Sequence, residues 1–547
     1  NISYGASENE TLKYDSWGKL IEKSKNGLVS KFKYDHFGRL VEKSEGSTIT
    51  RYAYDNYGKR ISRVLIKGKE VLDEYNTYDK FGRLVKTESN GKVVEYVYNK
   101  KNQLAEQIID GNRVVFEYTK LGQLAGKTLF NKDGKPLSEL KYFYSQNGKI
   151  MSRLANGKLQ GYKYDAKNQL LAVIDMESKL PVEEYVYDPS GNILQKTIAG
   201  ETTTYTYDAA NQLVSSIAPD GRETKYAYDA AGRMIREGDK TYEYGWLDKV
   251  MRVAENGKTL ANFEYHNNGQ IAKAIRESGI ENFEWDGLAL IERAIVSPSI
   301  EGALPFTPES ASPQTDYPLN KADKRIIYIN EPHAGGGNPV LAIGDNTEAI
   351  FTDMLGTSLG VASGNNYSQI TKTSFGSDSN NANSFFTGKP HVEDLGYVFL
   401  FRNYRADIGK WLSQDLIGYP DGWNNFAYCN NKSPIAVDRY GLYFTYSSND
   451  TVIVSAIEKI RNSAYGKDPS SSFYKMDNDR ANGVHIESSN SPSNFSPSVN
   501  DYGQTHINLN SNEGNNSNYV VRDKNGNVSS GNVSPESMLI HEIQHAI

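Results

Sequence analysis

The feature that most constrains this chain is a short motif that returns thirteen times between residues 14 and 265. In its fullest form it reads Lys-Tyr-Asp, two variable residues, Gly, Lys or Arg, and Leu, as at residues 13–20 and 33–40. The tyrosines of the copies are Tyr14, Tyr34, Tyr54, Tyr78, Tyr98, Tyr118, Tyr144, Tyr164, Tyr187, Tyr207, Tyr228, Tyr244 and Tyr265. Their mean spacing of about 21 residues is typical of a repeat architecture.

One repeat is long enough for two strands and two turns. Its flanks alternate between polar and apolar residues, as at 93–98 and 202–207, and this pattern predicts strands. The Asp can close a turn through its side chain, and the Gly or Asn that follows tolerates positive φ. Because a lone hairpin cannot bury its apolar face, neighbouring repeats must stack. The motif therefore predicts a long continuous sheet that curls as its twist accumulates, with the repeated Tyr and Asp as structural residues.

The composition agrees with this fold and limits the classes of molecule that the chain is expected to bind. The chain contains 38 Tyr and is 11% aromatic, which excludes a disordered chain and suits half-buried strand positions. The net charge of −6 gives no reason to expect nucleic acid or an anionic membrane as a general partner. The single cysteine, Cys429, excludes a disulfide framework. No apolar run approaches the roughly 18 residues of a transmembrane segment, so none is expected.

The motif resembles the YD (tyrosine-aspartate) repeats of RHS proteins. These include polymorphic bacterial toxins, the C components of Tc toxin complexes, wall-associated proteins and teneurins. The resemblance covers residues 1 to about 442 and implies a mainly all-β fold. In it a spiral YD-repeat β-sheet shell is closed by an RHS-associated core that acts as a plug. In the toxin members the shell holds the C-terminal toxin segment inside.

On this basis we divide the chain into four parts. They are a YD-repeat β-shell (1–295), a shell continuation with a linker (296–385), an RHS-associated core (386–442) and a small α+β toxin segment (443–547). Residues 283–287 are typical of the last turn of the array, and the proline-rich residues 297–325 predict a linker. Strand-like residues return at 325–329 and near 351–357, whereas the Ser- and Asn-rich residues 362–385 predict a loop.

Residues 386–442 resemble the RHS-associated core, which acts as an aspartyl autoprotease in many members of the family. They contain Phe-Thr-Gly-Lys at 386–389, Ser-Gln-Asp at 413–415 and Val-Asp-Arg-Tyr-Gly-Leu at 437–442. In many RHS proteins two Asp residues of this core cut the chain after the closing Gly-Leu and free the toxin segment. Asp415 and Asp438 fall on the matching positions, so the resemblance predicts cleavage between Leu442 and Tyr443. The chemistry needs two carboxylates that share a proton, one holding it and one activating water.

This chain departs from the family pattern at both aspartates. The family places Pro after each Asp, but Leu416 and Arg439 stand there in this sequence. A cation beside Asp438 could lower its pKa and disturb proton sharing. The alternative interpretation is that Asp415 and Asp438 only close turns.

The segment after residue 442 has a different character. Roughly a third of its residues are Ser or Asn, and the YD spacing is absent. Apolar spacing predicts an amphipathic helix at 451–460, and alternation predicts a strand at 505–510. Residues 519–528 predict a hairpin. Ser-Pro-Glu-Ser at 534–537 is typical of a helix start, and this predicted helix runs to the end of the chain.

The last helix contains a His-Glu-x-x-His motif formed by His541, Glu542 and His545. The two imidazoles lie on one helical face and can reach one Zn²⁺ at about 2.0–2.1 Å. Glu542 is placed to act as general base on a water that zinc makes acidic. The arrangement is similar to zincin metallopeptidases, which implies a zinc metalloendopeptidase. The alternative is a pair of surface histidines on an ordinary helix.

The zinc site is incomplete in this sequence. A catalytic zinc needs three protein ligands and a water, and in zincins the third ligand comes downstream. The chain stops two residues after His545, so we expect a fragment whose third ligand lies beyond Ile547. Upstream, His485 and His506 are expected to be surface or loop histidines.

Together these features predict a polymorphic RHS toxin fragment, secreted or delivered into a target cell. Its expected partners are a protein substrate, a cognate immunity protein, and a secretion system or toxin complex that delivers it. One alternative is a structural or adhesive YD-repeat surface protein with no active enzyme. Another is an RHS toxin of different chemistry, such as a nuclease, which the 7 basic and 11 acidic residues of 443–547 disfavour.

Overall fold

One antiparallel sheet of 34 strands dominates the molecule. The computed structural model describes residues 2–3, 9–25, 27–297, 323–331, 337–377, 383–415, 423–442 and 444–446, together with five short strands between residues 485 and 533. Each strand from β1 to β34 pairs antiparallel with the next one along the chain. The predicted β-sheet fold is therefore confirmed.

The strands follow the period of the repeat. The first half of the sheet consists of β1 (Ile2–Ser3), β2 (Asn9–Tyr14), β3 (Leu20–Lys25), β4 (Leu28–Tyr34), β5 (Leu40–Glu45), β6 (Thr48–Tyr54), β7 (Arg60–Lys67), β8 (Glu70–Tyr78), β9 (Leu84–Ser89), β10 (Lys92–Tyr98), β11 (Leu104–Ile109), β12 (Asn112–Tyr118), β13 (Leu124–Phe130), β14 (Pro136–Tyr144), β15 (Ile150–Ala155), β16 (Lys158–Tyr164) and β17 (Leu170–Asp175). The second half consists of β18 (Pro181–Tyr187), β19 (Ile193–Ile198), β20 (Glu201–Tyr207), β21 (Leu213–Ile217), β22 (Glu223–Tyr228), β23 (Met234–Glu237), β24 (Lys240–Tyr244), β25 (Val250–Glu255), β26 (Lys258–Tyr265), β27 (Ile271–Arg276), β28 (Gly279–Asp286), β29 (Ala289–Val296), β30 (Lys324–Asn330), β31 (Pro339–Ile343), β32 (Thr347–Thr352), β33 (Ser358–Ser363) and β34 (Asn366–Gln369).

Smaller elements follow the main sheet. They are β35 (Phe385–Phe386), β36 (Lys389–Val392), β37 (Gly396–Val398), β38 (Asn403–Arg405), β39 (Lys410–Trp411), β40 (Ala436–Asp438), β41 (Phe444–Tyr446), β42 (His485–Ser488), β43 (Ser498–Val499), β44 (Thr505–Leu509), β45 (Ser517–Arg522) and β46 (Val528–Val533). The described residues also contain two short 3-10 turns, η1 (Trp246–Asp248) and η3 (Tyr428–Asn431).

The repeated Asp closes each turn as predicted. In the first copy, Asp15 Oδ1 accepts hydrogen bonds from the backbone N–H groups of Trp17 and Lys19, both at 2.9 Å. Gly18 has φ +78°, which a residue with a side chain rarely adopts. Because the Asp carboxylate satisfies turn donors that a strand partner cannot reach, the motif ends one strand and starts the next.

The repeated Tyr joins neighbouring hairpins. Tyr34 donates its hydroxyl hydrogen to the carbonyl of Leu20 at 2.9 Å, and Tyr118 does the same to Leu104 at 2.8 Å. The acceptor is the Leu that ends the preceding motif, so the tyrosine of one copy binds the leucine of the copy before it. Trp285 makes the equivalent bond to Ile271 at 2.8 Å. The expectation that these residues are structural is confirmed.

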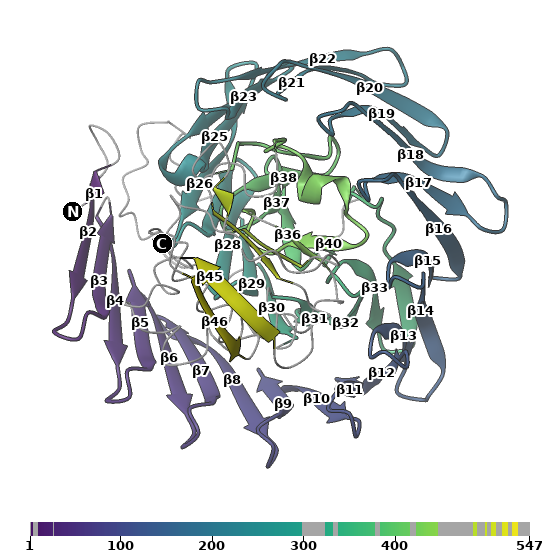
Figure 1. Ribbon diagram of the computed structural model, residues 1–547. Helices are drawn as coiled ribbons and strands as arrows, with labels where there is room; N and C mark the ends of the chain where they lie inside the picture. The colour runs from purple at the N-terminus through teal and green to yellow at the C-terminus, as the bar shows by residue number, and fades with distance from the viewer. Residues whose placement is uncertain are drawn as a thin grey trace.

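The sheet forms a spiral rather than a closed barrel. In Figure 1 the strands run around a ring, and β26 to β33 continue inside it. Contacts between distant residues join the two layers. Lys67 of β7 lies 2.8 Å from Glu284 and 2.9 Å from Glu292, and Leu72 packs in one apolar cluster with Ile291. The inner turn of the spiral therefore packs directly on the outer turn.

Two expectations for the middle region were wrong. The turn at residues 283–287 does not end the array, because β29 pairs with β30 and the sheet continues to β34. A further turn of the repeated kind follows β32, where Asp353 Oδ1 accepts hydrogen bonds from the backbone of Leu355 and Thr357 at 2.9 Å. The predicted loop at 362–385 contains β34. Most of the predicted linker lies outside the described residues.

The C-terminal segment is described only in its strands. The predicted strand at 505–510 is β44, and the predicted hairpin is the antiparallel pair of β45 and β46. In Figure 1 both hairpin strands are drawn within the outline of the ring. The predicted helices at 451–460 and 534–547 lie outside the described residues.

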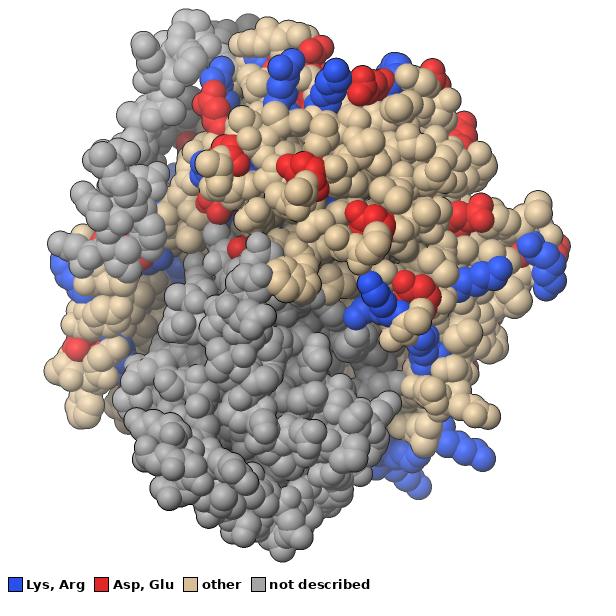
Figure 2. Space-filling model, turned by 45° about the horizontal axis from the view of Figure 1, so that its top comes forward, with Lys and Arg blue, Asp and Glu red and all other residues tan. Residues whose placement is uncertain are grey.

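The described surface carries charges of both signs. Basic and acidic side chains alternate along the upper edge of the view in Figure 2. Within the described ranges no helix is long and apolar enough to cross a membrane.

Candidate self-cleavage site

The segment predicted to be an RHS-associated core, residues 386–442, packs against the turns of the shell. Its centre is an aromatic cluster that includes Phe386, Tyr397, Phe399, Tyr404, Trp411 and Tyr428. Side chains of the core hydrogen-bond to a turn of the main sheet: Lys410 Nζ to Asn192 Oδ1 at 2.7 Å, and Asn431 Nδ2 to the carbonyl of Gly191 at 2.7 Å. These contacts fix the core on the shell.

Arg402 organises the interior of this core. Only 3% of its side chain is exposed, and its guanidinium lies 4.2 Å from the centre of the Trp411 ring. Its Nε donates to the carbonyl of Gly441 at 2.6 Å, and its Nη1 donates to the carbonyl of Asn425 at 3.0 Å. A permanent charge at this depth requires partners of opposite charge.

Both predicted aspartates supply that charge. Nη2 of Arg402 lies 2.7 Å from Asp415 Oδ2 and 3.4 Å from Asp438 Oδ2. The two carboxylates are 3% and 2% exposed. The structure therefore brings Asp415 and Asp438 to one buried nitrogen. Sequence reasoning gave Arg402 no role, although it opens the Arg-Asn-Tyr-Arg stretch of the core.

Asp438 also closes a turn, as the alternative interpretation expected. Its Oδ1 accepts hydrogen bonds from the backbone N–H groups of Tyr440 at 3.0 Å, Gly441 at 2.7 Å and Leu442 at 3.2 Å. This is the arrangement of the repeated Asp in the shell. The difference lies in the second oxygen, which is buried against Arg402.

The predicted cleavage point lies beside these groups. The carbonyl oxygen of Leu442 is 3.4 Å from Arg402 Nη2, the same nitrogen that contacts both carboxylates. Asp438 of β40 is the register partner of Phe444 in β41. The chain therefore lies near Asp438 both before and after the predicted cleavage bond. Tyr443 itself lies outside the described residues.

Burial controls the protonation of the site. Burial raises the pKa of Asp438, although the charge of Arg402 and the three backbone donors oppose this shift. The suggestion that the neighbouring Arg439 could lower the pKa of Asp438 was wrong. Burial outweighs the effect of nearby cations on this pKa, and the cation in contact with Asp438 is Arg402. Burial also lowers the pKa of Lys389, at the edge of the aromatic cluster, to about 7.

The residues of the predicted zinc motif, His541, Glu542 and His545, lie outside the described residues. His485 and His506, expected on the surface or in loops, fall in strands β42 and β44 and are register partners. Among the residues that the structure describes, no group of three or more His, Cys, Asp and Glu could hold a metal ion.

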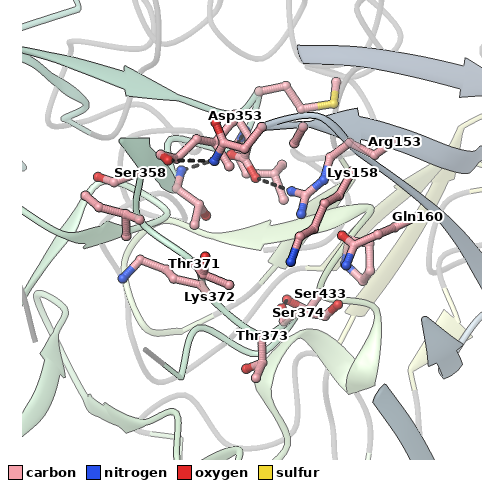
Figure 3. A pocket seen from close by; sticks show the side chains of 18 of the residues that line it. Arg153, Lys158, Gln160, Asp353, Ser358, Thr371, Lys372, Thr373, Ser374 and Ser433 are labelled. Atoms are coloured by element: carbon pink, nitrogen blue, oxygen red, sulfur yellow. Dashed lines mark hydrogen bonds and ion pairs between the residues drawn. The ribbon is translucent and has the colours of Figure 1, made fainter. Parts of the chain in front are cut away.

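A second polar pocket lies at the seam between the two turns of the spiral. In Figure 3 Arg153 of β15 points toward Asp353 of the inner turn, and Lys158 of β16 and Lys372 line the same pocket. Arg153 Nη1 lies 3.5 Å from Asp353 Oδ2, and Lys372 Nζ donates to the hydroxyl of Tyr397 at 3.0 Å. The pair of Arg153 and Asp353 joins the outer turn to the inner one at this pocket.

Comparisons with known proteins agree with this fold. The family model of the teneurin YD-shell matches residues 139–288. No curated protein matches the chain. Among solved structures, the Tc holotoxin pore of Photorhabdus luminescens with a mutated TccC3 is 14% identical, with a TM-score of 0.54, over 81% of this chain and 26% of that one. A TcdB2-TccC3-TEV crystal structure is 15% identical, with a TM-score of 0.49, over 79% of this chain and 27% of that one.

The family model and the holotoxin structure together define the class of the fold. The chain is a spiral YD-shell with the architecture of the shell in the Tc toxin structure. It spans about a quarter of the length of the solved chains that it matches.

Proposed function

We propose that this chain is the shell part of an RHS-type toxin and that it cuts itself between Leu442 and Tyr443. The observation that carries the proposal is the position of Arg402 Nη2. It contacts Asp415, Asp438 and the carbonyl oxygen of Leu442 at 2.7, 3.4 and 3.4 Å. Two buried carboxylates are the pair that aspartyl-type hydrolysis uses, and a fixed cation at the peptide carbonyl can stabilise the charge that develops on its oxygen.

The proposed step uses the two aspartates in different states. Asp438, whose pKa burial raises, holds the shared proton. Asp415 takes a proton from a water that attacks the carbonyl carbon of Leu442. Arg402 stabilises the negative charge that develops on the carbonyl oxygen. The bond to the nitrogen of Tyr443 then breaks, and Asp438 gives its proton to that nitrogen, so that one proton again remains on the pair.

Gel electrophoresis and N-terminal sequencing test this step. We expect the parent chain to give a new N-terminus at Tyr443, and D415N and D438N variants to stay intact. D353N is the matched control, because Asp353 also closes a buried turn and pairs with an arginine, Arg153, at 3.5 Å. Equal cutting of the parent and both site variants, or an intact parent, would overturn the proposal.

The segment after Leu442 is the proposed cargo of the shell. This is supported by the likeness of the shell to part of a Tc toxin structure. The proposal includes delivery into a target cell by a toxin complex or secretion system and, where the target is a bacterium, a cognate immunity protein. A structural or adhesive shell with no active enzyme remains the rival function.

For the cargo we propose a zinc metallopeptidase that acts on a protein substrate. The support is the His-Glu-x-x-His sequence, in which His541 and His545 would hold Zn²⁺ and Glu542 would act as base. The test is a chain extended past Ile547, with and without E542A, assayed for zinc content and toxicity. Zinc bound by both forms with toxicity only in the parent is expected. A chain that binds no zinc would favour the rival function.

A further inference from the structure

All turns of the YD motif lie along one edge of the sheet. Each of these turns joins an even-numbered strand to the next odd-numbered one, as 15–19 joins β2 to β3 and 119–123 joins β12 to β13. In an antiparallel meander such turns share one edge. Successive turns are two strands apart, which places them at intervals of roughly 9.5 Å. We call this the YD edge.

The first part of the YD edge exposes large apolar side chains at the turn tips. The exposed fractions are 83% for Trp17, 71% for Phe37, 89% for Tyr57, 71% for Phe81 and 86% for Leu121. We call the turns from 15–19 to 119–123 the aromatic edge. A row of neighbouring exposed rings is unusual on a soluble surface and marks a site of interaction.

The polar backbone of the aromatic edge is already satisfied within it. Lys19 Nζ donates to the carbonyl of Gly38 at 2.8 Å, and Gln103 Nε2 donates to that of Gly122 at 3.1 Å. Arg83 lies over two rings, 5.1 Å from the centre of Phe81 and 4.6 Å from that of Tyr98. The edge therefore presents rings and cations outward instead of free backbone acceptors.

The aromatic edge is also basic, although the whole chain has a net charge of −6. The remaining tip positions include the exposed residues Lys80, Lys100, Lys101 and Lys120. The tip positions hold no Asp or Glu, and the Asp that opens a turn is bound to the turn's own N–H groups, as Asp79 is to those of Phe81 and Arg83.

The rest of the YD edge is built differently. Where the RHS-associated core covers it, the tips are the small residues Ser190, Ala210 and Ala231. There the core hydrogen-bonds to the turns, for example through Asn424 Nδ2, which donates to the carbonyl of Ser190 at 3.2 Å. Small tips thus accompany the covering core at these three turns. The turn at 245–249, which also contacts the core, carries a large ring instead, and Lys25 lies 3.2 Å from the centre of the Trp246 ring. No described residue is shown to cover the rings of the aromatic edge.

We propose that the aromatic edge docks on an anionic lipid bilayer. Aromatic rings and Lys or Arg side chains are the residues that proteins place at a membrane interface, the rings at the level of the headgroups and the cations on anionic lipids. A single-stranded nucleic acid also stacks on rings, but it needs a basic groove along its backbone, whereas these tips lie on a projecting edge. The lipid chemistry is that of a phosphatidylglycerol-containing surface.

Sedimentation with lipid vesicles tests this docking. We expect the full chain to bind phosphatidylglycerol-containing vesicles at low salt and not phosphatidylcholine vesicles. The edge variant W17S/F37S/Y57S/F81S should bind about tenfold more weakly or worse. The charge variant K80Q/K100Q/K101Q/K120Q should weaken binding by a similar factor and remove its dependence on salt. Because all these side chains are exposed, neither variant should change the unfolding midpoint.

The matched control removes exposed apolar area elsewhere. F143S/V186S/V214S changes side chains that are 47%, 48% and 44% exposed on strands away from the turn tips, and it should bind like the parent. Failure of the parent to bind anionic vesicles, or equal binding by the edge variant and the control, would overturn the proposal. So would parent binding to single-stranded DNA, but not to vesicles, that the edge variant loses.

Discussion

At the scale of residues, the repeated Tyr and Asp act on different parts of each hairpin. The Asp carboxylate holds one turn closed, as Asp55 does with the backbone of Tyr57 and Lys59 at 2.9 and 2.8 Å. The Tyr hydroxyl binds the preceding hairpin, as Tyr54 does with the carbonyl of Leu40 at 2.8 Å. The Asp could be given its role from sequence, because its partners are two and four residues away. The acceptor of the Tyr could not, since it belongs to another repeat.

Removing one of these hydroxyls should cost measurable stability. Y118F leaves the carbonyl of Leu104 without its 2.8 Å donor, and an unsatisfied buried acceptor costs about 1–3 kcal/mol. We expect the free energy of unfolding in denaturant to fall by about that amount. Y57F is the control, because Tyr57 is 89% exposed and should leave the unfolding midpoint unchanged. An equal effect of the two variants would contradict the role given to the hydroxyl.

The pH dependence of self-cleavage should follow Asp438. Burial raises the pKa of this group, and the proposed step needs it protonated. Cleavage is therefore expected at pH values below the folded pKa of Asp438 and should fall as pH rises through it. The measurement is the single-turnover rate of self-cleavage against pH. K389M separates the second titrating group, because burial lowers the pKa of Lys389 to about 7. The charges of Lys389 and Asp438 interact, so K389M can shift the profile, but only loss of the titration in K389M would assign it to the lysine.

At the scale of elements, the sequence predicts what is local and periodic. The strands of the repeat alternate in burial, as in β10, where Val94 and Tyr96 are buried and Glu95 and Val97 are exposed. Strand β34 was missed because it is the last strand of the sheet and three of its four residues are exposed, so no apolar pattern marks it. Asp415 and Asp438 could be predicted from motifs. Arg402 could not, because its partner Asp438 is 36 residues away and no spacing rule links them.

One buried ion pair ties strand β5 to the turn after β26. His266 Nδ1 lies 2.6 Å from Glu45 Oε1. Burial would lower the pKa of His266, but the hydrogen bond to Glu45 and the charge of Glu284 raise it overall. Burial would raise the pKa of Glu45, but the bond to His266 lowers it to about 2. Both His266 and Glu45 are therefore charged at mildly acidic pH.

This pair should make stability depend on pH. The contribution of His266 is complete below its unfolded pKa of about 6.5 and is lost as pH rises through its higher folded pKa. The contribution of Glu45 is complete above about 4.5 and is lost as pH falls toward 2. H266A should lower the free energy of unfolding by about 3 kcal/mol near pH 6 and by less at alkaline pH. K273A, which breaks an exposed pair with Glu264, should change little; equal losses would contradict the prediction.

At the scale of the whole molecule, the sequence could not predict how the inner turn of the spiral packs within the outer turn. Lys67 with Glu292 and Lys127 with Thr352 both join residues 225 apart. The twist that each hairpin adds determines which residues of the two turns come into contact, and a local motif does not encode this twist. Arg63 belongs to the same seam: it is 1% exposed and lies 2.7 Å from Glu74 and 3.6 Å from Asp286 of the inner turn.

The nesting predicts how a cut chain behaves. If the shell encloses the segment after Leu442, the peptide bond can break without release, because the two turns and the core still surround the cargo. Size-exclusion chromatography of the self-cleaved parent should give one peak that contains both fragments, and denaturant should separate them. Arg60 pairs with the same two carboxylates, so the variant R60A/R63A is needed to leave Glu74 and Asp286 without their arginines, a loss of about 3–5 kcal/mol that falls on the seam. This variant should release the fragment under native conditions, whereas R51A, which breaks the exposed pair with Glu42, should retain it. Separate elution of the fragment from the cleaved parent would show that cleavage alone opens the shell.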